Sequence, residues 1–63
     1  MDERRVEKLT EQIMRGMGQQ DLGWYRMRGI VGHWLRNDVR ADADNTEIVR
    51  AWQAYADEMA ARL

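Results

Sequence analysis

Very few side chains in this 63-residue chain are suited to catalysis. His33 is the one group that titrates near neutral pH, and the sequence contains neither serine nor cysteine to act as a nucleophile beside it. On a helix, Arg26 and Arg36 would share the face of His33, and these cations disfavour a protonated imidazole rather than preparing a base. We therefore expect a protein that is not an enzyme.

The residues that bind metals are equally sparse. Without cysteine and with a single histidine, the chain has no Cys/His zinc site. The sequence Asp42-Ala43-Asp44-Asn45 resembles the start of a calcium-binding EF-hand loop, but Glu47 and Gln53 stand where that loop needs a glycine and a bidentate glutamate. The glutamates near the amino terminus alternate with basic residues, as on a solvated helix face. We expect no metal and no cofactor.

Groups suited to binding gather instead in residues 22–37, which contain no acidic side chain. The whole chain has a formal charge of -1, so this stretch differs in sign from the molecule around it. At about 100° per residue, a helix here has two opposite faces. One face, predicted to be a cationic contact surface, carries Arg26, Gly29, His33, Arg36 and Arg40. The other, predicted to be core, carries Trp24, Met27, Val31, Trp34 and Leu35.

This stretch predicts binding to a partner protein that has an acidic surface. Tryptophan, tyrosine and arginine dominate the binding energy of many interfaces, and arginine adds charge complementarity. Two glycines, Gly29 and Gly32, would let another backbone come close. The predicted partner-binding residues are Trp24, Tyr25, Arg26, Arg28, His33, Arg36 and Arg40. The same arginines also fit a solvated face that pairs with acidic residues of the third helix or of a neighbouring chain.

The alternative function is a small dimeric DNA-binding transcriptional regulator of the phage or plasmid type, which would use the same basic helix. The negative net charge disfavours it, because small DNA-binding domains release phosphate counterions with an excess of cations. A helix-turn-helix also fits poorly, since aligning its turn glycine on Gly29 or Gly32 puts Tyr25 or Arg28 where a small residue is needed. The GXXG spacing of residues 29–32 lacks the strands of an RNA-binding KH domain.

The elements that would position these residues are all helical. The sequence has no proline and no alternation of polar and apolar residues, so strands are poorly supported. The apolar spacing predicts one all-α domain over residues 1–63, a three-helix up-down-up bundle with helices at about 2–16, 21–40 and 45–63. Three internal glycines weaken the second helix and predict a kink or break near Gly29 to Gly32, with four helices as the fallback.

Shorter sequence patterns predict where helices begin and which of their side chains are buried. Asp21 and Asp44 are predicted N-caps, and Asp44 stands three residues before Glu47 in the pattern of a capping box. The apolar stripes centred on Ile13, Val31 and Trp52 are predicted to meet in the core. Met14 lies about 80° from the centre of its stripe and is expected to widen an exposed apolar patch.

The small size of the chain predicts self-association. Domains of about 60 residues bury only ~60% of the surface their unfolded chains expose, and this chain has neither disulfide nor metal to supplement its core. A homodimer is the expected form. No apolar run follows the charged residues 2–5, so we expect a cytoplasmic protein without a signal peptide, a membrane span or a membrane partner.

Overall fold

The chain folds into three α-helices, and the residues that the structure describes contain no strand. The structure is a computed structural model, and it describes residues 1–17 and 23–62. The helices are α1 (Glu3–Met17), α2 (Trp24–Asn37) and α3 (Asn45–Ala61). None of these helices is long and apolar enough to cross a bilayer.

The start of α3 agrees with the sequence prediction, whereas the carboxyl end of α2 differs from it. The predicted N-cap of α3 is confirmed, because the Asp44 carboxylate accepts the Glu47 backbone N–H at 3.0 Å. The α2 helix ends at Asn37 rather than at Arg40, so the predicted range of 21–40 is too long at its carboxyl end. Its start follows Gly23, which makes no side-chain capping bond. The predicted N-cap Asp21 lies outside the described residues.

The α2 helix is continuous through its glycines, so the predicted break near Gly29 to Gly32 is wrong. Tertiary packing explains this continuity, since Val31 and Leu35 are fully buried and Trp34 is nearly so. Such burial contributes about 1.5–3 kcal/mol for each large apolar side chain, which exceeds the cost of about 1 kcal/mol for each internal glycine.

The core forms where the predicted stripes meet. Its buried apolar residues are Val6, Leu9, Ile13, Met14, Val31, Trp34, Leu35, Ile48 and Trp52. Met14 is 4% exposed, so its predicted place in an exposed patch is wrong. The reason is that α1 packs against both other helices, which widens its buried face beyond one stripe.

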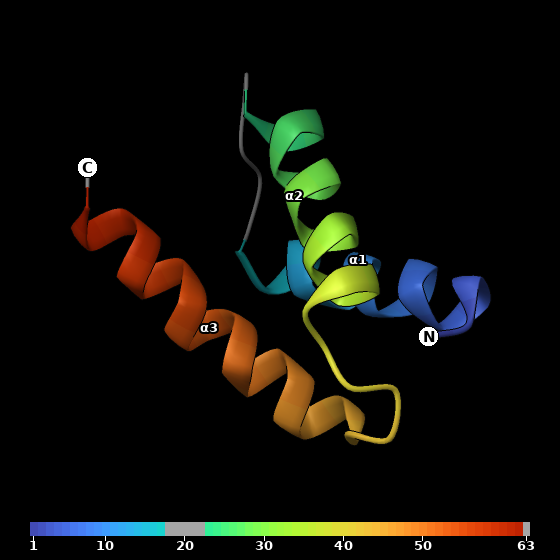
Figure 1. The fold of residues 1–63 in the computed structure, drawn as a ribbon. Coiled ribbons are helices and arrows are strands. Elements are labelled where there is room, and N and C mark those ends of the chain that lie inside the picture. Colours follow the sequence, from blue (N-terminus) through green and yellow to red (C-terminus); the bar gives the residue numbers. More distant parts are fainter. Residues whose placement is uncertain (18–22, 63) are drawn as a thin grey trace.

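The helices cross rather than lie side by side, and the predicted up-down-up arrangement is not confirmed. Figure 1 shows α1 passing behind the lower part of α2, while α3 runs obliquely from the α2–α3 loop to the carboxyl end. No described residues of α2 and α3 bring their Cα atoms within 8 Å. Aromatic rings fill this space instead: Trp34 lies 5.3 Å from Trp52 and 6.0 Å from Tyr55, measured between ring centroids.

Arg5 fastens the α2–α3 loop to α1. Its guanidinium donates to the carbonyl oxygens of Ala41 (2.6 Å) and Ala43, and to Oδ1 of Asn45 (2.9 Å from Nη2). A planar guanidinium with five donors suits several acceptors at once. The contact sets where α3 begins relative to α1, and we name it the Arg5 clip.

Candidate functional site

The residues predicted for partner binding lie in separate places on and beyond α2. Tyr25, Arg28 and Arg36 line one groove between α1 and α2, and the half-buried Trp24 adjoins it through Arg28. Arg26 and His33 are exposed outside this groove. The structure therefore divides the single cationic face that helical spacing predicted.

The α1–α2 groove is the candidate site, because it gathers more of the predicted residues than any other described hollow. It is lined by Val6, Glu7 and Thr10 from α1 and by Tyr25, Arg28, Gly29, Gly32 and Arg36 from α2. Thr10 is buried at 4% exposure, whereas most of the charged groups are open to solvent. The groove offers cationic and aromatic groups above a small, neutral floor.

One end of the groove is an aromatic and cationic cluster. The Tyr25 side chain is 82% exposed and meets the Trp24 ring edge-on, with centroids 5.0 Å apart. Arg28 lies over the same indole, 5.7 Å from its centroid, within the range of a cation–π interaction. No acidic side chain within the described residues pairs with Arg28. We name these three residues the Trp24–Arg28 cluster.

The other end of the groove is closed by an ion pair. Arg36 donates from Nε and Nη2 to both carboxylate oxygens of Glu3, with 3.1 Å from Nε to each. This hydrogen bond from Arg36 is the main reason that the pKa of Glu3 lies below its usual value, with the charge of Arg36 and of the chain's amino terminus adding to it. The charge of Arg36 is thus compensated inside the chain.

Gly32 makes room for this ion pair. A Cβ atom at position 32 would lie 2.9 Å from Nη1 of Arg36, too close for an undisturbed contact. The space that the sequence assigned to an approaching backbone is therefore taken by the chain's own guanidinium. At Gly29 a Cβ atom would have nothing within 4 Å, so that position stays open.

The remaining predicted residues lie outside the groove. Arg26 is exposed, with no hydrogen-bond or ion-pair partner within the described residues. His33 is exposed, and its Nδ1 lies 3.2 Å from Nδ2 of Asn37. Arg40 lies past the end of α2 and pairs with Asp42 at 2.9 Å, so it does not share the helical face on which spacing placed it.

Sequence reasoning missed the part of the site that α1 supplies. Glu7 and Thr10 line the groove, yet Glu7 was interpreted as part of a solvated face and Thr10 drew no interpretation. A signal was present for Thr10, which lies at the i+4 position from Val6 on the apolar stripe. Glu7 carried none, because only the crossing of α1 over α2 brings it to the groove.

Neither a metal site in the described residues nor a match to a known protein indicates a function. Among residues 1–17 and 23–62, no group of three His, Cys, Asp or Glu side chains is placed to hold a metal ion. Comparison with protein-family models, with curated proteins and with solved structures finds no match to this chain. The groove and its residues are therefore the features from which a function is inferred.

Proposed function

We propose that this chain is a non-enzymatic interaction module that self-associates as a homodimer and binds a partner protein through the Trp24–Arg28 cluster. The partner presents acidic side chains to Arg28 and Arg26 and an apolar surface to Tyr25. The observation that carries the proposal is the 82% exposure of Tyr25 beside a half-buried Trp24 and an Arg28 without an acidic partner in the described chain.

The composition of the cluster supports an interface. Tryptophan, tyrosine and arginine are the residues whose truncation most often costs 2 kcal/mol or more at interfaces. Tyr25 is one of two exposed large hydrophobic side chains among the described residues, and the other, Tyr55, is 37% exposed.

The position of the cations on α2 supports an acidic partner. Arg26 and Arg28 lie in the first two turns of a helix whose first turn has no acidic residue. Cations near the positive end of a helix dipole are unfavourable, and anions there are favourable. Carboxylates from a partner would relieve this arrangement, whereas the chain's own acidic residues do not reach it in the described structure.

The groove's own charges favour protein over nucleic acid as the ligand. Glu3 neutralises Arg36, which leaves Arg28 as the one uncompensated arginine among the residues that line the groove, whereas a phosphate backbone needs several such cations. The chain as a whole is slightly negative, which adds long-range repulsion of DNA.

The test is photo-crosslinking in the source cell with a reactive aromatic residue at position 25, and with the same residue at position 15 on the exposed side of α1 as the matched control. The protein captured only from position 25 is then purified, and its affinity is measured for the unmodified chain, Arg28→Glu and Arg15→Glu. We expect Arg28→Glu to weaken binding by at least about tenfold and Arg15→Glu by less than about twofold.

Equal losses for the two charge reversals would contradict this proposal. So would micromolar binding of a mixed-sequence DNA duplex that falls steeply with salt, since that dependence marks phosphate contacts.

A further inference from the structure

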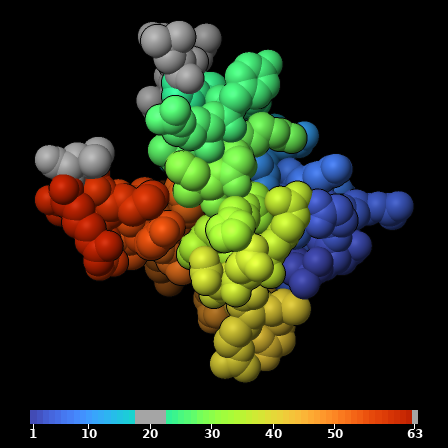
Figure 2. All heavy atoms as spheres, turned by 45° about the horizontal axis from the view of Figure 1, so that its top comes forward, coloured from blue at the N-terminus to red at the C-terminus, as the bar shows by residue number. Residues whose placement is uncertain are grey.

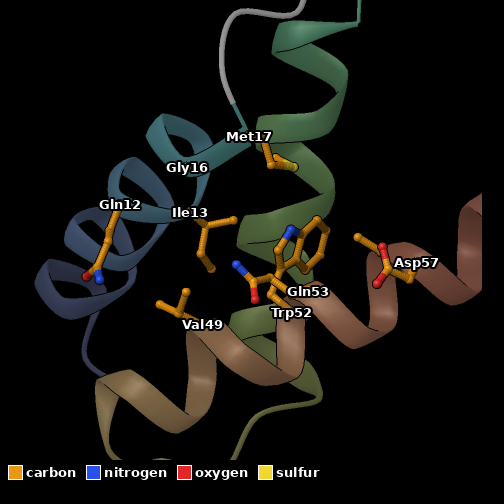
Figure 3. Close-up of a pocket in the computed structure, with 9 residues that line it drawn as sticks. Gln12, Ile13, Gly16, Met17, Val49, Trp52, Gln53 and Asp57 are labelled. Atoms are coloured by element: carbon orange, nitrogen blue, oxygen red, sulfur yellow. The ribbon is translucent and has the colours of Figure 1, made fainter.

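A second groove lies between the carboxyl-terminal end of α1 and the middle of α3. Apolar side chains from both helices line it, with amides and one carboxylate at its edge: Gln12, Ile13, Gly16, Met17, Val49, Trp52, Gln53, Ala56 and Asp57. Figure 3 shows Ile13, Val49 and Gln53 facing this space from opposite sides, with the Trp52 indole at its base. A Cβ atom at Gly16 would meet nothing within 4 Å, so the α1 side is open.

The chain exposes more surface than a monomer of its mass. A folded monomer of 7.5 kDa exposes about 4,250 Å² by the usual scaling, and this chain exposes 4938 Å². The chain thus exposes about 700 Å² more than this scaling gives. The Cα radius of gyration, 11.2 Å, also exceeds the value of about 10.6 Å expected for this length.

The edge of α3 that borders the groove carries complementary charges. Arg50 and Asp57 are seven residues apart, which is close to two helical turns, so both lie on the same edge. Both are exposed, and neither has a hydrogen-bond or ion-pair partner within the described residues. Two such helices packed antiparallel, crossing near Gln53 and Ala54, place the Arg50 of each opposite the Asp57 of the other.

We propose that the α1–α3 groove is the homodimer interface and that it receives α3 of a second copy, antiparallel to the first. This rests on the self-association in the proposed function and assigns it a surface. Val49 and Ala56 are half-buried and are covered fully by the second helix, while the exposed Ala60 lets it approach closely. The arrangement is isologous, so each Arg50–Asp57 contact occurs twice about the two-fold axis.

The Trp24–Arg28 cluster is outside this interface. None of its residues lines the α1–α3 groove, so the dimer leaves both copies of the cluster open to a partner protein. A dimer formed in this way presents the cluster twice, which raises the avidity for a partner with repeated acidic sites.

The test measures the dimer dissociation constant by sedimentation velocity for Arg50→Asp, for Asp57→Arg and for an equal mixture of the two. Each variant alone opposes like charges twice, and we expect its dissociation constant to rise by at least about tenfold. In the mixture, both contacts between unlike chains are attractive, so heterodimers form with the affinity of the unmodified chain. Arg4→Asp, on the opposite side of α1, is the control, and circular dichroism checks that every variant is helical.

Three results would overturn the proposal: dimers of unchanged affinity in both single variants, a mixture that stays as weak as its components, or an unmodified chain that is monomeric at about 100 μM. None of these results bears on partner binding at the Trp24–Arg28 cluster. That function is tested by Arg28→Glu, which lies outside α3.

Discussion

The two halves of α2 have similar composition and different roles. The carboxyl-terminal half is embedded: Leu35 is fully buried, Trp34 packs on Trp52, and Arg36 pairs with Glu3. The amino-terminal half carries the exposed Tyr25 and an Arg26 without a partner in the described structure. In Figure 2 the start of α2 (green) projects at the top, while its end (yellow-green) lies between α1 (blue) and α3 (orange to red).

The difference shows what decides the role of an arginine on a helix. Arg28 and Arg36 both line the α1–α2 groove, but α1 presents Glu3 to Arg36 and no acidic partner to Arg28. The neighbouring helix, by supplying Glu3, thus separates an arginine that is paired inside the chain from one that has no acidic partner in the described structure.

The largest expected effect on stability comes from truncating a buried side chain in the carboxyl-terminal half of α2. Leu35→Ala removes a side chain with 0% exposure and should lower the free energy of unfolding by about 2–5 kcal/mol, because a cavity replaces it. Tyr25→Ala, in the projecting half, should change it by less than about 0.5 kcal/mol. Urea denaturation followed by circular dichroism measures both. Comparable losses at the two positions would mean that the halves do not differ in packing.

The Arg5 clip extends the embedded region into the α2–α3 loop. Arg5→Met keeps much of the aliphatic stem but loses the bonds to Ala41, Ala43 and Asn45, so we expect a loss of about 1–2 kcal/mol in the free energy of unfolding. The adjacent Arg4→Met is the matched control and should be near neutral, since Arg4 is exposed. If both substitutions cost the same, the clip contributes nothing specific.

Gly29 and Gly32 lie in the middle of α2 and differ in what surrounds them. Gly29→Ala places a methyl group in open space and should stabilise the helix by about 1 kcal/mol. Gly32→Ala should gain less, because its Cβ displaces the Arg36 guanidinium from Glu3. In a Glu3→Gln background, Gly29→Ala and Gly32→Ala should raise the free energy of unfolding by similar amounts. If Gly32→Ala still gains less there, the ion pair is not the cause of the difference.

The smallest expected effect is the dependence of stability on pH at Glu3. Its folded pKa is lowered below the ordinary value of 4.5, so the ion pair contributes fully above that pH and is lost as the pH falls through the folded pKa. The stability difference between the unmodified chain and Glu3→Gln should therefore be constant near neutral pH and shrink in acid. Denaturation curves at several pH values check this, and a difference that grows in acid would contradict it.

The sequence was sufficient to predict the helices, because the patterns that indicate a helix lie within a short stretch of the chain. The spacing of Val6, Leu9 and Ile13 predicts the buried side of α1, and the Asp44 cap marks the start of α3. These features depend on residues within one or two turns of each other. The three-helix, all-α class follows from them without knowledge of how the helices pack.

The arrangement of the helices and the candidate site depend on tertiary contacts, which the spacing does not contain. Helical spacing extended α2 to Arg40. In the structure, the loop carbonyls of Ala41 and Ala43 accept hydrogen bonds from Arg5, which lies 36 and 38 residues earlier in the chain. Likewise, nothing in the spacing of α2 indicates that Arg36 pairs inside the chain, because only the crossing of α1 brings Glu3 to it. The width of the buried face of α1, which includes Met14, has the same origin.

The Arg5 clip also bears on which substitutions the loop tolerates. Two of its three acceptors are main-chain carbonyls, at Ala41 and Ala43, and every amino acid supplies that group. The exposed Ala41 can therefore be exchanged for almost any residue without loss of the clip, whereas position 5 accepts little besides arginine. Among natural variants of this chain, the path of the loop would be kept by one residue in a distant helix while the loop's own sequence drifts.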